Sequence, residues 1–314
     1  MKNMLRFLMC MALLLPSVGC DHRELCYDHS HMQTVKVEFD WSQAPDASPA
    51  TMVVWFFPTD GSQGFRYELL PPDQDTRSTF DAEIRVPAGT YRVFCHNGST
   101  DNNSERGTTF DDYSLITFDD ELLKPLNRAE NAPRPEGTEN QPVRASSSEV
   151  WAHTLSDAVT ITRDDRKTHT VRFTPQQMHE NWHITITGVE NLTADMDVSA
   201  IVTGVAEAYS PALGHSSGSD VTIPFGMRHC GADCLKGDVT IFGDNAPHDI
   251  HHYLRIYTSF NYYYDFDITE QVHKASVGHD IEISLAGLKL HNPSGGMMPG
   301  VSGWENAEDQ DLKM

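Results

Sequence analysis

The sequence is poor in basic residues, in cysteine and in long apolar runs. It carries 23 lysines and arginines against 45 aspartates and glutamates, so the net charge is −22 at pH 7. Such an acidic surface repels nucleic acid, and no nucleic-acid partner is expected. After the N-terminal segment no apolar run approaches the ~20 residues that a membrane-spanning helix needs. Six cysteines in 314 residues are too few for a disulfide scaffold.

Two further absences narrow the classes of protein. Apolar residues nowhere recur at helical spacing over three turns with capping residues, which argues against a parallel sheet with crossover helices. No glycine-rich phosphate loop stands between a strand and a helix. The sequence therefore predicts neither a nucleotide-binding enzyme nor any bound cofactor.

The N-terminus has the three parts of an export signal. Lys2 and Arg6 form a basic start, residues 7–15 are apolar, and Ser17-Val18-Gly19-Cys20 follows. Small residues ahead of a cysteine resemble the lipobox that a bacterial lipoprotein signal peptidase reads. An ordinary signal peptide with an incidental cysteine is the alternative. We expect residues 1–19 to be a lipoprotein signal peptide and Cys20 to carry lipid that anchors the mature chain to a membrane.

Short alternating runs dominate the mature chain. In residues 34–41, Val35, Val37, Phe39 and Trp41 share one face of a predicted half-buried strand. Residues 52–57 are more continuously apolar, as in a central strand. Further strands are predicted, with turn residues between them, over 65–69, 84–86, 91–95, 113–118, 159–162, 171–173, 182–186, 221–225, 253–257, 266–268 and 281–285.

These runs predict an all-β protein of two antiparallel β-sandwich domains. Residues 122–149 hold four prolines and almost no apolar side chain, which indicates a linker or long loop. The predicted division is a lipidated tether over 20–33, an N-terminal sandwich over 34–121, the linker or loop over 122–149 and a C-terminal sandwich over 150–314.

Gly214-His215-Ser216-Ser217-Gly218 spells the G-x-S-x-G pattern of many hydrolases. That pattern works only where a strand enters the turn and a helix leaves it. Here a strand-like run, Val221 to Pro224, follows the motif. We predict a Gly/Ser loop and no catalytic residues.

Histidines and cysteines cluster in two segments, His248 to His252 and Cys230 to Cys234. Zinc needs three or four convergent ligands, but adjacent His251 and His252 point to opposite faces of a strand. The sequence therefore predicts a polar loop with no metal site. Cys230 and Cys234 are close enough to pair or to remain free thiols, and Cys26 could pair with Cys95; the sequence leaves both questions open.

Tyr262-Tyr263-Tyr264 and Trp304 could form an aromatic platform for a sugar ring. Aromatic residues in strands are more often packing residues. A glycan-binding surface protein is therefore the alternative function rather than the first.

Several segments together resemble one family. They are residues 20–26, 35–41, 52–58, 86–91, 266–273, 304–306 and 311–314. Their order behind a lipidated cysteine resembles the fimbrillin-like lipoproteins of Bacteroidales, in a branch near the minor-fimbrillin anchor and accessory proteins.

The resemblance implies two transthyretin-like β-sandwich domains and a non-enzymatic role as fimbrial anchor or accessory subunit. Other fimbrial subunits would be the partners, joined by β-strand addition through residues 34–41 or 308–314, with a host or glycan ligand as a further partner. The alternative is that each segment completes a sheet of its own domain, and for residues 34–41 we expect this alternative. Shaft subunits of the family lose an N-terminal strand after cleavage at a basic residue. Arg23 is too near the lipid and Arg66 lies beyond two predicted strands, which favours an anchor or accessory role. The expected location is the cell envelope, lipid-anchored in the outer membrane and exposed at the surface.

Overall fold

The computed structural model describes residues 31–71, 80–98, 100–124, 126, 132–164, 166–244, 250–275, 279–291 and 304–306. The signal segment, Cys20 and the predicted donor residues 308–314 lie outside this part of the chain. Strands dominate the described residues, and the predicted all-β class is confirmed. The described helices are short, and none has the length and apolar character needed to cross a bilayer.

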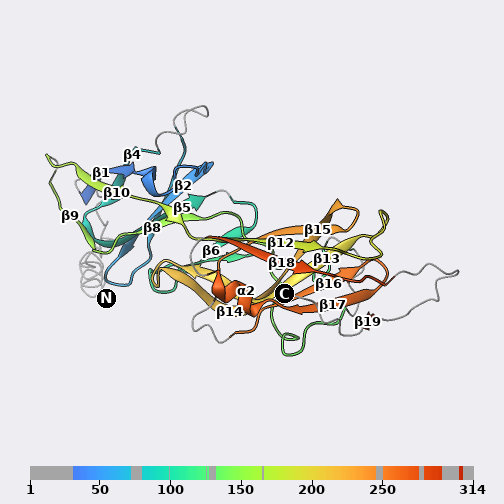
Figure 1. Cartoon of the computed structure of the whole chain (residues 1–314). Coiled ribbons are helices and arrows are strands. Elements are labelled where there is room, and N and C mark those ends of the chain that lie inside the picture. Colours follow the sequence, from blue (N-terminus) through green and yellow to red (C-terminus); the bar gives the residue numbers. More distant parts are fainter. Residues whose placement is uncertain are drawn as a thin grey trace, which may run out of the picture.

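Two smaller sheets form one end of the molecule (Figure 1). The first has the order β10-β1-β4. The second has the order β11-β8-β5-β2-β3, with β9 also paired to β5. Their bounds are β1 (Met32–Phe39), β2 (Thr51–Pro58), β3 (Phe65–Leu69), β4 (Ala82–Pro87), β5 (Gly89–Gly98), β8 (Trp151–Thr154), β9 (Val159–Ile161), β10 (His169–Phe173) and β11 (Gln176–Gln177).

A ten-stranded sheet forms the other end (Figure 1). Its order is β18-β12-β15-β14-β13-β16-β17-β19, and β6 and β7 join through β13. The bounds are β6 (Asn103–Arg106), β7 (Ser114–Thr117), β12 (Glu180–Thr187), β13 (Val198–Ser210), β14 (His215–Gly231), β15 (Cys234–Ile241), β16 (Tyr253–Thr258), β17 (Tyr262–Asp267), β18 (Asp280–Ala286) and β19 (Glu305–Asn306).

The predicted first strand forms as β1 and ends two residues early. Val35 and Val37 are buried between the two smaller sheets, as the alternation predicts. The Asp40 carboxylate accepts a hydrogen bond from the Ser42 amide and begins a 3-10 turn over Trp41–Gln43. β1 pairs antiparallel with β4 and parallel with β10, so it completes the sheet of its own chain.

β2 is a central strand with both faces covered, as its continuous apolar run predicts. One face packs against the three-stranded sheet. The other face presents Val53, Trp55 and Phe57 to a cluster that includes Tyr209 of β13 and Phe242 beyond β15. Because this cluster draws on the six-stranded and the ten-stranded sheets, a packed aromatic core joins the two ends of the molecule.

Strand pairing crosses the predicted linker in both directions. β7, from before residue 122, pairs with β13 of the ten-stranded sheet. β8, β9 and β10, from after residue 149, pair with β5 and β1 at the other end. The sheets therefore do not follow the division at 122–149 that composition indicates. The reason is that the short strands after the loop place Ala152, Ile161 and Phe173 in the cores around β2 and β5.

The described part of the 122–149 segment contains no named strand and is held against the ten-stranded sheet. The amide of Arg144 donates to the Thr222 carbonyl over 2.9 Å, and that of Ser147 donates to the Thr240 carbonyl over 2.8 Å. Leu123 is fully buried beside Tyr257. This stretch is an extended covering for β14 and β15.

The ten-stranded sheet folds over its own core. β14 pairs with β13 through Met227 and then with β15 from Arg228 onward. Residues from both ends of the strand order, including Ile283 of β18 and Phe266 of β17, lie in one hydrophobic cluster. A single helix of more than one turn, α2 (Thr269–Lys274), lies between β17 and β18 in the described sequence.

Candidate functional site

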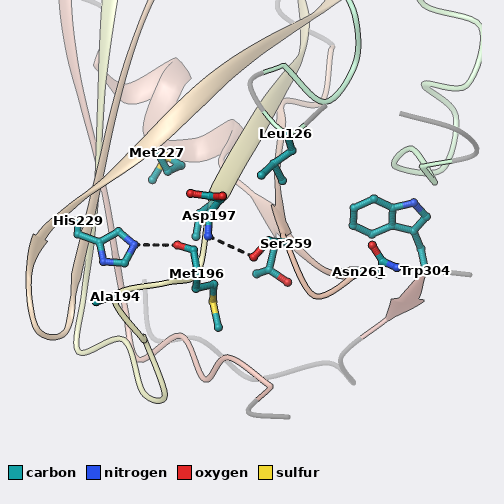
Figure 2. Close-up of a pocket in the computed structure, with 11 residues that line it drawn as sticks. Leu126, Ala194, Met196, Asp197, Met227, His229, Ser259, Asn261 and Trp304 are labelled. Atoms are coloured by element: carbon teal, nitrogen blue, oxygen red, sulfur yellow. Dashed lines mark hydrogen bonds between the residues drawn. The ribbon is translucent and has the colours of Figure 1, made fainter. Parts of the chain in front are cut away.

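A cavity of about 540 Å³ lies where the β16–β17 turn meets the start of β13 and the end of β14 (Figure 2). Its lining mixes polar and apolar side chains. The lining residues are Leu126, Ala194, Met196, Asp197, Val198, Met227, His229, Thr258, Ser259, Asn261 and Trp304.

Hydrogen bonds to the backbone fix this lining. Nε2 of His229 donates to the Met196 carbonyl over 3.0 Å, which holds the end of β14 against the start of β13. The Asp197 amide donates to Oγ of Ser259 over 3.2 Å, and the Ser259 amide donates to the Asp197 carbonyl over 2.9 Å. Asn261 adopts a positive φ of 63°, which closes the β16–β17 turn. These contacts define the shape of the cavity wall.

Trp304 brings the C-terminal segment to the cavity. Its ring packs on Tyr257, with centroids 5.3 Å apart, and the Tyr257 hydroxyl donates to the Pro133 carbonyl over 2.6 Å. Directly after Trp304, β19 pairs in parallel with Tyr262 and Tyr263 of β17. One short strand thus places an aromatic side chain in the cavity wall.

The described edges of the ten-stranded sheet differ in how they are covered. At β18, the side-chain amide of Gln271 pairs with both backbone groups of Ser284: Nε2 donates to its carbonyl over 3.2 Å, and its amide donates to Oε1 over 2.9 Å. The Gln271 side chain thus makes the two backbone hydrogen bonds that a neighbouring strand would make at Ser284. At β17, the described partner on the outer side covers only Tyr262 and Tyr263, so Tyr264 to Asp267 have no described strand beyond them.

The predicted tyrosine platform is not a free surface. Tyr262 stacks on His291 at 4.2 Å between centroids. The guanidinium of Arg255 lies over the Tyr263 ring, 4.2 Å from its centroid. Tyr264 is buried in the core. The structure therefore places only Trp304 of the predicted aromatic set in the cavity.

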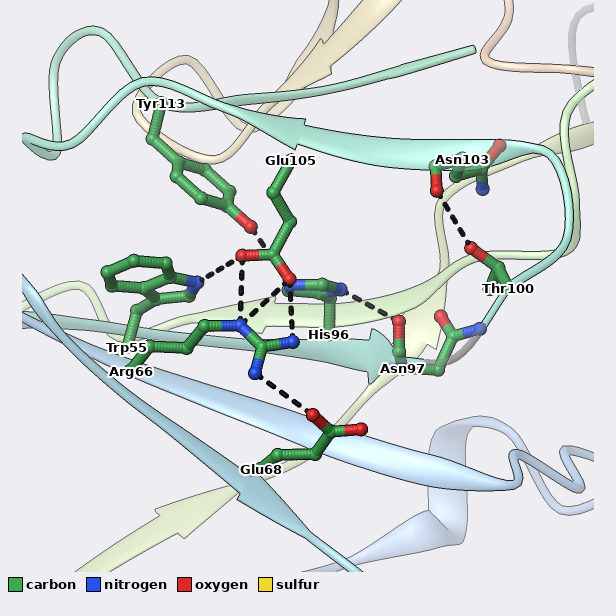
Figure 3. A network of polar contacts seen from close by, with 9 residues as sticks. All are labelled: Trp55, Arg66, Glu68, His96, Asn97, Thr100, Asn103, Glu105 and Tyr113. Carbon is green, nitrogen blue, oxygen red and sulfur yellow. Dashed lines mark hydrogen bonds and ion pairs between the residues drawn. The ribbon is translucent and has the colours of Figure 1, made fainter. Parts of the chain in front are cut away.

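A polar network occupies the junction of the two ends (Figure 3). Glu105 of β6 accepts hydrogen bonds from Nε1 of Trp55 over 3.0 Å and from the guanidinium of Arg66. Nδ1 of buried His96 donates to the Asn97 carbonyl, and Nε2 accepts from the Tyr113 hydroxyl over 2.9 Å. Sequence reasoning missed this network, because its members lie in five separate segments between Trp55 and Tyr113 and share no common motif.

Burial sets the protonation states in this network. Burial lowers the pKa of His96, and the Glu105 carboxylate only partly opposes it. Burial alone would raise the pKa of Glu105, but hydrogen bonds from Arg66 and the positive charge beside it hold that pKa below its usual value. The network is therefore a neutral imidazole beside a compensated ion pair. Such an arrangement stabilises the junction between the two ends.

The hydrolase-like motif lies in a β-hairpin, where its last four residues begin β14 rather than forming the predicted Gly/Ser loop. β14 begins at His215, directly after Gly214, so a strand leaves the turn in place of the helix that a nucleophile elbow requires. The Ser216 hydroxyl donates to the Asp244 carbonyl. The serine is thus a structural donor.

Cys230 and Cys234 form a disulfide across the β14–β15 turn, which resolves the first of the open cysteine alternatives. Cys95 is a free buried thiol, and its proposed partner Cys26 lies outside the described residues. His251 is exposed and His252 is fully buried, so the adjacent pair diverges as predicted. His248 also lies outside the described chain.

The fold defines the chain as an all-β protein of the type found in Bacteroidales adhesins and fimbrial proteins. Similar solved structures include a candidate adhesin from Bacteroides ovatus, with a TM-score of 0.62 and 18% identity over 88% of this chain and 99% of that one. The fimbrial anchor protein Mfa2 from Porphyromonas gingivalis has a TM-score of 0.53 and 13% identity over 81% of this chain and 90% of that one.

A second candidate adhesin from Bacteroides ovatus has a TM-score of 0.53 and 10% identity, with 85% of this chain and 91% of that one covered. At these identities the likeness concerns the fold, and at that level the predicted resemblance to fimbrillin-like proteins is confirmed. Comparison with curated proteins gave no match. The chain belongs to the family described as a domain of unknown function (DUF5119), whose model matches residues 19–226.

Proposed function

We propose that this chain is a non-enzymatic lipoprotein of the cell surface, lipidated at Cys20 in the outer membrane. It serves as an anchor or accessory subunit of a fimbria and binds other subunits by β-strand addition. Its two smaller sheets form one transthyretin-like sandwich, and the ten-stranded sheet forms the second. The fold shared with a fimbrial anchor protein supports this role.

The outer edge of β17 is the observation on which the proposal depends. β19 already adds to this edge in parallel, but its described pairs stop at Tyr263 and Asn306. The cavity that opens beside Asn261 and Trp304 offers space for a side chain of an incoming segment. Backbone pairing beside a side-chain pocket is the combination that strand addition requires.

Two of the other described edges carry features that discourage a new strand. Gln271 caps the middle of β18. On β3, Arg66 and Glu68 form an exposed ion pair, and charged side chains on an edge oppose strand pairing. Of these three edges, the one beyond Tyr263 is the favoured acceptor.

The disulfide and the charge are consistent with an exported protein. The bond between Cys230 and Cys234 persists in oxidising compartments outside the cytosol. A net charge of −22 favours solubility, because the molecules repel one another, and it disfavours nucleic acid as a partner.

Photo-cross-linking on living cells tests the proposal. A benzoylphenylalanine placed at Asn261, in the cavity wall, is expected to cross-link a fimbrial subunit. The matched control is the same residue at Leu213, which is 59% exposed and lies at the far β13–β14 turn. Deletion of the gene is expected to change fimbria length, number or retention. Unchanged fimbriae, together with no cross-link specific to Asn261, would contradict the proposal.

Glycan binding is the second candidate, and Trp304 favours it because an aromatic ring in an open cavity can stack on a sugar. The Tyr262 to Tyr264 faces, by contrast, are already covered. A glycan array followed by calorimetry tests this role. Saccharide binding that disappears in Trp304→Ala but persists in Tyr263→Ala would establish it.

A further inference from the structure

Three ligand-type side chains converge inside the ten-stranded end of the molecule, away from the cavity. Asp244 follows β15, His252 precedes β16 and His273 lies in the last turn of α2. One carboxylate oxygen and one nitrogen of each ring lie within 4.8 Å of one another. The three residues come from separate segments, so no spacing in the sequence indicated this cluster.

The surrounding structure fixes His252 firmly. Its side chain is fully buried, and its backbone amide donates to Oγ1 of Thr269 over 2.9 Å. Its ring meets the Trp182 indole edge-on, with centroids 5.6 Å apart. Nδ1 lies 3.1 Å from the Thr203 carbonyl oxygen. The ring therefore cannot turn away from the cluster without losing these contacts.

The bond to Thr203 determines which ring nitrogen carries the proton. A carbonyl oxygen only accepts, so Nδ1 of His252 must be the donor, and in the neutral ring Nε2 carries a lone pair. Nε2 is buried and makes no hydrogen bond to any described residue. It faces Oδ2 of Asp244 at 3.6 Å, beyond hydrogen-bond length. Two lone pairs that face one another in a buried site are favourable only with a metal ion or a proton between them.

The distances fit a metal ion. Nε2 of His273 also lies 3.6 Å from Oδ2 of Asp244, and the two imidazole rings are nearly perpendicular at 86°. A tetrahedral zinc with bonds of 2.0–2.1 Å separates its ligand atoms by roughly 3.3–3.4 Å. A shift of a few tenths of an ångström would bring both of these nitrogen–oxygen separations to the tetrahedral value.

We propose that Asp244, His252 and His273 bind a divalent transition-metal ion, with zinc as the best match. Two imidazoles and one carboxylate are ligands that zinc prefers. The hydrogen bond from Nδ1 of His252 to the Thr203 carbonyl is the outer contact that orients metal-bound histidines. The His273 side chain is 25% exposed, so the ion can enter from that side.

The neighbourhood is also acidic. Burial raises the pKa of the Glu180 carboxyl, and the charge of Asp244 raises it further, although the Trp182 indole hydrogen bond opposes both. A cation would offset this crowding of acidic groups. Bound metal would connect the chain after β15, the start of β16 and α2. Its role would therefore be structural, and the site is independent of the proposed fimbrial function.

Metal binding to the full mature chain tests the proposal. The protein is freed of metal with chelator and titrated with Zn²⁺ by calorimetry and with Co²⁺ by visible absorption. We expect one ion per chain and the intense Co²⁺ bands of a tetrahedral site. Zn²⁺ should raise the melting temperature by about 5 °C or more when its concentration is near 100 times the dissociation constant.

Asp244→Asn and His273→Ala are the test variants. His252 is left unchanged, because it is fully buried and a substitution there would disrupt the fold most. Each is expected to weaken Zn²⁺ binding at least about tenfold and to remove the Co²⁺ bands, with an unchanged circular dichroism spectrum. His251→Ala, the exposed neighbour, is the matched control and should bind as the parent does. The proposal fails if the parent binds no stoichiometric Zn²⁺, which would point to a protonated His252 paired with Asp244. It fails equally if both test variants keep the Co²⁺ spectrum.

Discussion

The guanidinium of Arg66 on β3 holds the Glu105 carboxylate on β6 at two points, with Nη2 2.9 Å and Nε 3.0 Å from Oε1. β3 belongs to the six-stranded sheet, and β6 joins the ten-stranded sheet through β7 and β13. The pair therefore spans the junction between the two ends. It lies beside the aromatic cluster around Trp55 and Phe57, and both contacts fix how the ends meet.

Glu105→Ala is expected to lower the free energy of unfolding by about 1–3 kcal/mol, because it leaves Arg66 and the Trp55 indole without an acceptor. Denaturant unfolding monitored by tryptophan fluorescence measures the change. Glu270→Ala is the matched control: it breaks an exposed pair with Lys274 and should leave the free energy of unfolding close to that of the parent. Equal losses in the two variants would show that the junction pair has no special role.

Acid should destabilise the protein through His96. Burial lowers the pKa of His96 in the folded chain below its ordinary value of 6.5. The unfolded chain therefore binds a proton near pH 6.5 that the folded chain does not. The stability contributed by the neutral ring is complete above pH 6.5 and declines as the pH falls toward the folded pKa. Unfolding midpoints measured between pH 7.5 and 5 should show this decline, and it should be smaller in His96→Gln.

His183 supplies a control of opposite sign. Its hydrogen bond to Asp238 raises its pKa in the folded state, so protonation of this exposed ring favours folding as the pH falls. His183→Gln should therefore make the acid decline slightly steeper, whereas His96→Gln makes it shallower. A common direction for both variants would contradict the assignment.

Removal of the disulfide should cost about 2 kcal/mol, because the bond closes a loop of only about five residues and little chain entropy is gained. The double variant Cys230→Ser and Cys234→Ser tests this by thermal and denaturant unfolding. Mass spectrometry after alkylation, with and without reductant, checks that the bond is present in the parent. A fully alkylated parent without reductant would contradict the pairing.

Gln271 should both stabilise the edge strand β18 and protect it from pairing with strands of other molecules. Gln271→Ala removes two hydrogen bonds to Ser284, which exposes the backbone of β18 to other chains. We expect concentration-dependent association in analytical ultracentrifugation and a stability loss of about 1–2 kcal/mol. Glu270→Ala, next to it in the chain, should remain unassociated. A monomeric Gln271→Ala variant would show that the edge needs no cap.

Lipid at Cys20 is a prediction that depends on the N-terminal segment alone. Cells that express the parent should retain it in the membrane fraction, and mass spectrometry of the N-terminal peptide should show acyl chains on Cys20. Cys20→Ala should appear as soluble protein. Membrane retention of Cys20→Ala without another modification would contradict lipid anchoring.

The sequence predicts a strand best where one face of the strand is buried and the other is exposed to solvent. β1 and β18 alternate in burial along almost their whole length, and both were predicted from that alternation. β13 was missed because both of its faces are covered and 12 of its 13 residues are buried. Its sequence therefore shows no alternation of apolar and polar residues. β15 was missed because Gly237 interrupts its apolar face. A Cβ at Gly237 would lie 2.5 Å from Sδ of Met227, so glycine is required at that crossing.

Pairing between distant strands was not accessible from periodicity. β10 lies 130 residues after β1, yet Val35 stands opposite His169 in a parallel ladder. Local patterns specify which face of a strand is buried but not which strand lies beside it. The same limit applies to the sites. Trp304 was predicted as a binding aromatic, whereas the cluster of Asp244, His252 and His273 exists only once three separate segments meet.

The placement of β1 has a mechanical consequence. A tether attached ahead of Met32 would pull along the axis of a strand that pairs with β4 from Met32 to Val37 and with β10 from Val35 to Phe39. Tension in that direction loads the bonds of both ladders together, in shear, so they do not open one after another as in a zipper. If the chain is anchored as proposed, traction between the membrane and a bound filament would therefore be carried by both ladders of the first strand.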